Sequence, residues 1–208
     1  MKNETKKQKH FKDERTFVIV KPDGIQRSLV GEVVRRFERI GLKLVALKMV
    51  LPTAELVEKH YTCNPDWKRS AGQKAIDNYI KKGLVPPETD PVKVGTRVLN
   101  NLKKYMTSGP VVVMVLQGAH AVGITRKLVG GTEPLSSDVG TIRGDFVLDS
   151  YEMSDLDGRS IRNLIHASGN VAEAEYEIDL WLRPEEIVKY RHLHETILYD
   201  VNLDGILE

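Results

Sequence analysis

Hydrophobic and polar positions divide the first fifty residues into a strand, a helix and a second strand. Residues 16–20 are β-branched or aromatic and precede a Pro-Asp-Gly turn, which predicts a buried strand that ends at Lys21. Residues 29–40 carry apolar side chains at helical spacing, and Gly41 supplies a stop signal. Residues 42–51 then predict the second strand.

The middle of the chain predicts a helix, an irregular segment and a third strand. Thr53 can cap a helix whose end holds Tyr61, a side chain that could face a ligand. Between residues 62 and 101 the periodicity weakens and proline and glycine recur, so we interpret this segment as an insertion with some helix. Residues 111–116 are an apolar run typical of a buried strand, and residues 119–129 predict a short helix.

The last third predicts two extended segments and a helix. Residues 146–150 and 163–166 are expected to be extended, and a polar, acidic second insertion at about 150–159 lies between them. Asn170 can then cap a helix in which Glu173 completes a capping box. Its apolar stripe consists of Val171, Ala174, Ile178 and Trp181.

Strands and helices therefore alternate up to a fourth strand, and helices follow. This order fits an α+β, ferredoxin-like split β-α-β sandwich with a four-stranded antiparallel sheet. The pattern by itself supports a parallel doubly wound sheet almost equally well.

Composition limits the class of protein. A hydrophobic content of 41% in 208 residues suffices for one ordinary domain, and 31 basic against 29 acidic residues give no reason to expect a polyanion-binding surface. No stretch approaches the ~20 apolar residues of a membrane span, and no apolar signal-peptide core is present near the start. We therefore expect a soluble, cytoplasmic protein without a membrane partner. Cys63 is the only cysteine, so no intrachain disulfide is possible.

The lysine-rich residues 1–13 have the composition of a flexible basic tail. A nucleic-acid-binding arm is the alternative, and we consider nucleic acid an improbable partner because the chain lacks the aromatic-basic motif of an RNA-recognition domain.

His166 is the candidate for the chemistry, because it lies between an apolar run and a turn of small residues. An imidazole can be a neutral nucleophile at physiological pH, provided that a partner on its second nitrogen fixes the tautomer. Glu177 lies beside the inward stripe of the following helix and could be that partner. From these two residues alone, a structural histidine and a solvated carboxylate remain an open alternative.

Neither a Walker loop nor a protein-kinase glycine loop occurs in the chain. Five motifs occur in a fixed order, however, and together they resemble the nucleoside diphosphate kinase family. They are Lys-Pro-Asp-Gly at 21–24, Ser-Gly-Pro at 108–110, Gly-Thr-Ile-Arg-Gly-Asp-Phe at 140–146, Arg-Asn-Leu-Ile-His-Ala-Ser at 162–168 and Leu-Trp-Leu-Arg-Pro-Glu-Glu at 180–186. The resemblance covers roughly residues 14–190, apart from the two insertions, and leaves residues 191–208 as a C-terminal extension.

The resemblance implies a ferredoxin-like antiparallel sheet with helices on one face, and it implies a ping-pong reaction. A histidine, here His166, would take the terminal phosphate of a nucleoside triphosphate and pass it to a nucleoside diphosphate. Magnesium would arrive with the nucleotide, and the family's assembly as hexamers or tetramers implies a homo-oligomer here too.

Site residues follow from the same resemblance, position by position. Glu177 would bind the non-reacting nitrogen of His166, and Ser168 would support Glu177. The residues matched to nucleotide contacts are Arg126, Thr132 and Arg143 at the phosphates, Lys21 and Asn163 at the sugar, and Tyr61 beside the phosphates and the histidine. Because Asn163 precedes His166 by three residues, their side chains can share one site only if the chain bends between them.

Departures from the family pattern leave a second hypothesis open. The family commonly has His-Gly-Ser-Asp, whereas this chain has Ala167 and Gly169 at the second and fourth positions, so Asn170 would take over the helix cap. The base-stacking phenylalanine also has no clear counterpart, and Trp67 is a candidate. A catalytically weak, nucleotide-binding regulatory module on the same fold is therefore the alternative. The sequence gives no further role to His60, His120, His192 and His194, which we expect to be structural or surface residues.

Overall fold

A four-stranded sheet forms the centre of the protein in a computed structural model that describes residues 11–200. Its strands lie in the order β2-β3-β1-β4, and every neighbouring pair is antiparallel. The α+β, ferredoxin-like prediction is therefore confirmed, and the parallel alternative is excluded. The strands are β1 (Arg15–Val20), β2 (Lys43–Val50), β3 (Val111–Gln117) and β4 (Ile165–Ala167).

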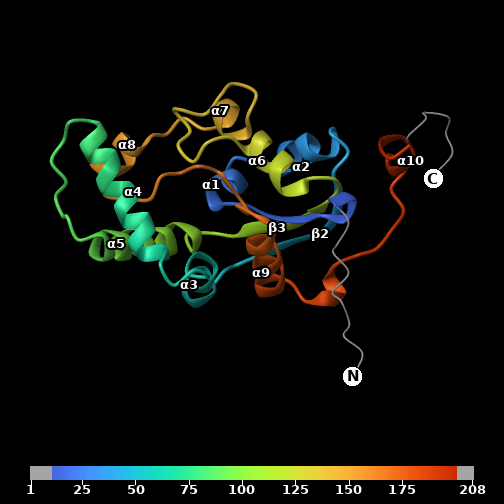
Figure 1. The fold of residues 1–208 in the computed structure, drawn as a ribbon, viewed down its shortest axis with the longest axis horizontal. Helices are drawn as coiled ribbons and strands as arrows, with labels where there is room; N and C mark the ends of the chain where they lie inside the picture. The colour runs from blue at the N-terminus through green and yellow to red at the C-terminus, as the bar shows by residue number, and fades with distance from the viewer. Residues whose placement is uncertain (1–10, 201–208) are drawn as a thin grey trace.

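Helices fill the connections between these strands (Figure 1). The first connection holds α1 (Pro22–Gln26) and α2 (Val30–Glu38). Between β2 and β3 lie α3 (Ala54–Tyr61), α4 (Trp67–Lys81) and α5 (Pro91–Met106). Between β3 and β4 lie α6 (Ala121–Val129), α7 (Ile142–Phe146) and α8 (Tyr151–Leu156). After β4 come α9 (Val171–Trp181) and α10 (Glu195–Leu198), and 3₁₀ turns occupy Phe11–Asp13 and Pro184–Glu186.

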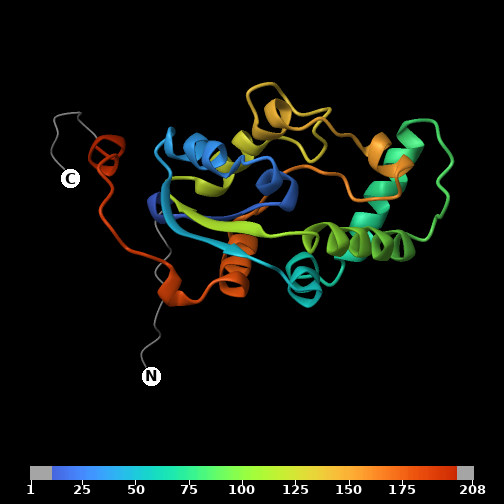
Figure 2. The same ribbon diagram turned by 180° about the vertical axis from the view of Figure 1, so that it is seen from behind.

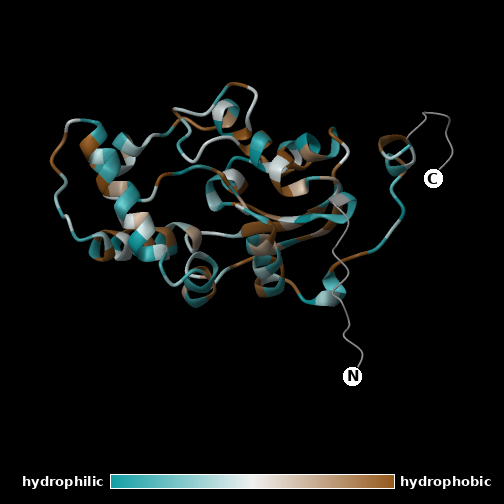
Figure 3. Cartoon of the chain, viewed as in Figure 1, coloured by the Kyte–Doolittle hydropathy of each residue, from teal (hydrophilic) through white to brown (hydrophobic). Residues whose placement is uncertain are grey.

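Both faces of the sheet are covered, so the expectation of helices on one face was wrong. Strand β1 is buried on both sides, and its side chains alternate between two hydrophobic clusters. Val18 and Val20 pack in one cluster with Phe37 of α2, whereas Phe17 and Ile19 pack in the other, which contains residues of α3 and α9. Figure 2 shows α2 and α6 on one side of the sheet and α3 and α9 on the other. The helices carry hydrophobic and hydrophilic turns side by side (Figure 3), as amphipathic elements do.

The extended segment predicted at 146–150 is wrong in part. Phe146 ends helix α7, only residues 147–150 are irregular, and α8 follows directly. Thr141 Oγ1 accepts a hydrogen bond from Gly144 N, and Ser150 Oγ accepts one from Met153 N. These hydroxyl caps start helices that are too short to give a hydrophobic period.

The first insertion, predicted as an irregular segment with some helix, is mostly helical. Asp90 caps α5 by accepting from two backbone N–H groups, and α5 continues to Met106, beyond the insertion predicted to end at residue 101. Helices α4 and α5 cross at two glycines: a Cβ on Gly72 would lie 1.8 Å from the carbonyl oxygen of Pro91, and one on Gly95 would lie 1.8 Å from that of Lys68. Only glycine permits this approach of the two backbones. In both ribbon views the crossing helices lie at the end of the molecule where α8 also lies (Figures 1 and 2).

No helix within residues 11–200 is long and apolar enough to cross a membrane. The predicted basic tail at 1–13 falls largely outside the described residues, as does the last part of the 191–208 extension.

Candidate active site

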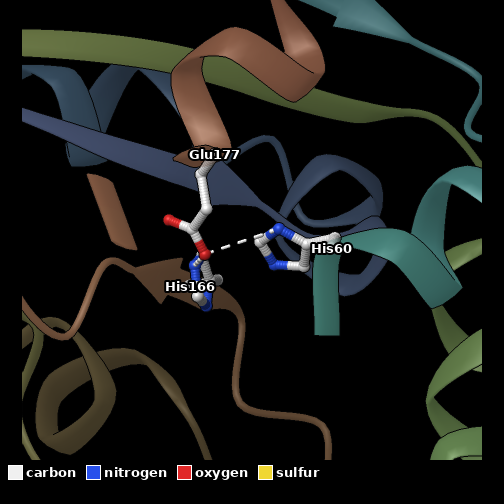
Figure 4. A group of neighbouring side chains, drawn as sticks. All are labelled: His60, His166 and Glu177. Carbon is white, nitrogen blue, oxygen red and sulfur yellow. Dashed lines mark hydrogen bonds and ion pairs between the residues drawn. The ribbon is translucent and has the colours of Figure 1, made fainter. Parts of the chain in front are cut away.

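His166 and Glu177 face each other at the β4 side of the sheet (Figure 4). His166 lies on β4 opposite Ile19 of β1, and Glu177 projects from α9. His166 Nε2 lies 2.7 Å from Glu177 Oε1. A carboxylate only accepts hydrogen bonds, so the ring proton is on Nε2 and Nδ1 keeps its lone pair. The predicted partner thus meets the candidate nucleophile.

The carboxylate of Glu177 is held at both oxygens. Ser168 Oγ donates to Glu177 Oε2 at 2.6 Å, and Phe17 N donates to Ser168 Oγ at 3.2 Å. Glu177 is only 1% exposed, and burial raises the pKa of its carboxyl group, against the lowering effects of His60 and Ser168. Ser168 therefore contacts the carboxylate that the resemblance implies it supports.

The surroundings of His166 favour a neutral imidazole. Burial lowers its pKa well below the ordinary value, and the positive charges of Lys21, Arg143 and Arg126 lower it further. These basic residues, which we call the three cavity cations, come from three different parts of the chain. The arrangement favours an uncharged imidazole facing a negatively charged ligand.

Lys21 is buried at the end of β1, where it reaches the β4 side of the site. Its Nζ donates to Asn163 Oδ1 at 2.6 Å, and Asn163 Nδ2 donates to the carbonyl oxygen of Thr132 at 3.0 Å. Burial, followed by the charge of Arg143, lowers the pKa of Lys21 to about 7, although Asp23 opposes the shift. Three residues predicted as nucleotide contacts are therefore linked by hydrogen bonds.

The bend expected between Asn163 and His166 is present. Leu164 has a φ of +64°, in the left-handed region, and Ile165 N donates to the carbonyl oxygen of Asn163 at 2.6 Å. Positive φ is unfavourable for a branched side chain, so the turn is strained locally. The turn brings Asn163 and His166 to the same cavity.

Arg143 makes structural contacts in addition to the phosphate contact that the resemblance implies. Its guanidinium donates to four backbone carbonyl oxygens, at 3.1 Å to Asn163, 3.1 Å to Gly130, 2.8 Å to Gly131 and 2.5 Å to Ile165. Burial lowers its pKa to about 10, with a further lowering by Arg126. Arg143 therefore joins the loop after α6 to the chain before and within β4, in addition to placing a positive charge in the cavity.

The predicted nucleotide-contact residues line one cavity of about 490 Å³ beside His166. Tyr61 has a buried Oη without a hydrogen-bond partner among the described residues, and burial raises the pKa of its phenol. Arg126 is exposed on α6, so its guanidinium can meet a ligand directly. The predicted residues that line the cavity are Lys21, Tyr61, Arg126, Thr132, Arg143, Asn163 and His166.

Both insertions contribute to the cavity wall. Trp67 at the start of α4 lines the cavity, and its ring lies 5.7 Å from that of Tyr61 between centroids. Asp155 of α8 and Tyr79 of α4 line it too. Asn101 of α5 also donates to the carbonyl oxygen of Gly158 at 3.3 Å. The inserted segments thus extend the cavity away from His166 as one wall.

The start of α9 compensates for the departure at Gly169. Asn170 Oδ1 accepts from Glu173 N at 2.9 Å, and Glu173 Oε2 accepts from Gly169 N at 3.0 Å. The prediction that Asn170 caps this helix is confirmed.

His60 is the site residue that the sequence reasoning missed. It is 2% exposed, its Nδ1 lies 3.4 Å from Glu177 Oε1, and its ring centroid lies 4.5 Å from that of His166 (Figure 4). The sequence predicted the helix that carries His60, but local pattern could not indicate which distant residue its imidazole meets. The other histidines within residues 11–200, at 120, 192 and 194, do not line the cavity.

Comparison with known proteins identifies the family to which the fold and the site correspond. The family model described as nucleoside diphosphate kinase matches residues 14–78 and 91–187. The fold is of the α+β class, and the match to the family model identifies the protein as a nucleotide-binding kinase.

Relatives agree along nearly the whole length. A nucleoside diphosphate kinase of Pyrobaculum aerophilum is 50% identical over 180 residues, which span 85% of this chain and 98% of the relative. The crystal structure of an NDP kinase from the same organism matches with a TM-score of 0.81 at 49% identity, over 85% of this chain and 100% of that one. A nucleoside-diphosphate kinase from Borrelia burgdorferi, solved as a transition state mimic with bound vanadate and ADP, matches with a TM-score of 0.70 at 38% identity, over 88% and 94%.

The chain therefore belongs to the nucleoside diphosphate kinase family, and the prediction that it is an enzyme of this family is confirmed.

Proposed function

We propose that the protein transfers the terminal phosphate of a nucleoside triphosphate to a nucleoside diphosphate by a ping-pong reaction through a phosphohistidine on His166. The observation that carries this proposal is the His166–Glu177 pair on the wall of a cationic cavity. Glu177 retains the proton of His166 on Nε2, which leaves Nδ1 as the nucleophilic atom.

In the first half-reaction, a bond forms between His166 Nδ1 and the terminal phosphorus while the bond from that phosphorus to the bridging oxygen breaks. The electron pair of the broken bond leaves with the nucleoside diphosphate. In the second half-reaction, a terminal phosphate oxygen of another nucleoside diphosphate attacks the same phosphorus and the bond to Nδ1 breaks. No proton has to leave Nε2 in either step, so Glu177 orients the ring throughout and stabilises the positive charge that develops on it.

Arg126 and Arg143 would stabilise the phosphate charge during transfer, because phosphoryl transfer depends mainly on positioning and electrostatics. Arg126 offers a guanidinium that has no carboxylate partner within the described part of the chain, Thr132 and Tyr61 offer hydroxyl groups, and Lys21 with Asn163 would contact the sugar. Few of these groups would read the base, so we propose broad base tolerance.

Magnesium fits this site as an ion bound to the substrate. The carboxylates that line the cavity are Asp155 and Glu173, whereas both oxygens of Glu177 are hydrogen-bonded. When bound, the ion would neutralise phosphate charge and keep several waters. The protein residues would then hold the phosphates and not the metal. The vanadate and ADP bound by the Borrelia burgdorferi relative support a phosphate-binding role for the corresponding cavity.

We also propose a cytoplasmic homo-oligomer, a hexamer or a tetramer. Strand β2 is at the sheet edge and exposes apolar side chains, with Leu47 47% and Met49 62% exposed, and Leu51, directly after the strand, is 75% exposed. An exposed apolar edge favours pairing with a second copy. Light scattering on the purified chain would give the number of subunits.

One assay tests the proposed reaction. The protein is incubated with ATP labelled at the terminal phosphate, and an acid-labile, alkali-stable phosphoprotein is expected that discharges onto GDP. Nucleotide binding without labelling would instead favour the catalytically weak regulatory module. The hydrogen-bonded Glu177 and Ser168 argue for the active enzyme.

A Glu177→Gln variant should slow phosphoenzyme formation by about 10- to 100-fold. In metal sites, losing the hydrogen-bond partner of a metal-bound imidazole typically has an effect of this size. Nucleotide affinity should not change, because Glu177 faces His166 and not the phosphates. Asp179→Asn, which alters an exposed carboxylate on the same helix, is the matched control. A normal phosphorylation rate together with an unchanged ¹⁵N spectrum of His166 would show that another residue orients the ring.

Trp67→Ala should raise the KM for nucleotides by about tenfold with little change in kcat. We expect Trp67 to stack on the base, a contact worth ~1–3 kcal/mol that is made equally in the ground and transition states. Trp67→Phe, which keeps an aromatic ring, should retain most of the affinity. If Trp67→Ala left KM unchanged while subunit assembly or stability fell, the wall around α4 would have a structural role only.

A further inference from the structure

A third side chain, His60, meets the His166–Glu177 pair from α3 (Figure 4). Donor atoms of the three residues lie within 4.8 Å of one another, and two imidazoles with a carboxylate form a donor set that Zn²⁺ accepts. The three cavity cations lie close enough to lower the pKa of His166, however, and the same positive field opposes a divalent cation. The cluster is therefore better explained by its hydrogen bonds.

Nδ1 of His60 faces two neighbours with incompatible requirements. Trp181 Nε1, which can only donate, lies 3.3 Å from it. Glu177 Oε1, which only accepts as a carboxylate, lies 3.4 Å from it. A neutral imidazole carries either a lone pair or a hydrogen at Nδ1, so His60 can serve Trp181 or Glu177 but not both.

A doubly protonated His60 is not a third possibility. Burial, followed by the influence of His166, lowers the pKa of His60 to about 3, although Glu177 opposes the shift, so the ring is neutral at physiological pH. In the Nε2–H tautomer, Nδ1 accepts from Trp181, and the Nε2–H group is buried without a partner among the described residues. The unsatisfied donor destabilises this tautomer. The tautomer therefore persists only while Nδ1 accepts the hydrogen bond from Trp181.

The choice of tautomer determines how Glu177 Oε1 is shared. With the proton on Nε2 of His60, Oε1 accepts from His166 Nε2 at 2.7 Å and receives nothing from His60. With the proton on Nδ1, Oε1 would divide its hydrogen bonding between two imidazoles. The bond to His166 would then weaken, and with it the fixed orientation of the candidate nucleophile.

We propose that Trp181 holds His60 in the Nε2–H tautomer, and that His60, so held, is a positioning residue that reserves Glu177 for His166. The inference rests on the proposed function, because its effect on the rate acts through His166. Its structural part, the tautomer of His60, can be measured without any turnover.

The test is Trp181→Phe, which removes the only hydrogen-bonding group of Trp181 and keeps an aromatic ring against Phe17, whose centroid lies 5.9 Å away. In the nucleotide-free enzyme, ¹⁵N NMR should show the proton of His60 moving from Nε2 to Nδ1. Phosphoenzyme formation should slow by about 3- to 10-fold, the effect of weakening one hydrogen bond, with KM unchanged. A thermal melt checks that the variant folds.

A double-mutant cycle separates this role from packing. In a His60→Phe background there is no imidazole to compete for Glu177, so Trp181→Phe should cause no further slowing. An equal slowing in both backgrounds, or a His60 proton that stays on Nε2 in Trp181→Phe, would overturn the proposal. If the unmodified protein forms no phosphoenzyme, the proposed function fails, whereas the NMR measurement still decides the tautomer.

Discussion

A His166→Ala variant should form no phosphoenzyme and should lose nucleotide-dependent phosphate transfer. Among residues 11–200 no other imidazole lines the cavity, since the neighbouring His60 is 2% exposed and is not part of the cavity wall. The fold should remain, because the His166 side chain is partly exposed at the cavity wall and belongs to neither hydrophobic cluster. The measurement is acid-labile labelling from ATP, with His192→Ala as the control. Substantial residual labelling would remove His166 from the mechanism.

Removing either cavity arginine should slow transfer by at least ~10²-fold, because each would stabilise charge on the transferring phosphate. The two variants should differ in stability. Arg126→Ala leaves the fold unchanged, since its side chain is exposed on α6. Arg143→Ala leaves four carbonyl oxygens without their donor and should also lower the melting temperature.

Rates of phosphoenzyme formation and thermal melts on both variants test this difference, and Arg35→Ala, at an exposed arginine of α2, is the matched control. A near-normal kcat for either cavity arginine would assign that arginine to structure or surface alone. Equal stability of the two variants would mean that the carbonyl contacts of Arg143 contribute nothing measurable.

Local pattern predicted the parts of the fold that depend on nearby residues. The strand at 16–20, the Thr53 cap and the Asn170 cap are each specified within a few positions. Local pattern did not predict whether the strands pair parallel or antiparallel. Strand β1 is buried on both faces, and its apolar run is equally compatible with a parallel sheet. The resemblance to a family supplied that choice.

The site residues, too, were predictable only where nearby positions in the chain specify them. Motif spacing indicated His166 and its partner Glu177, which lie in adjacent elements. It gave no indication of His60, which reaches the pair from α3 over more than a hundred residues of chain. Nor did it indicate that Arg143 would be occupied by backbone carbonyls, since a guanidinium has the same sequence signature in either role.

The crossing of α4 and α5 has a practical consequence. Because Gly72 and Gly95 set the crossing by backbone contact, the connecting residues 82–90 do not have to hold the two helices together. The match to the family model skips residues 79–90, and lengthening such a loop costs little closure entropy. This connection is therefore the natural attachment point for a fluorescent label or a grafted domain, whose movement would report on the cavity wall without entering the cavity.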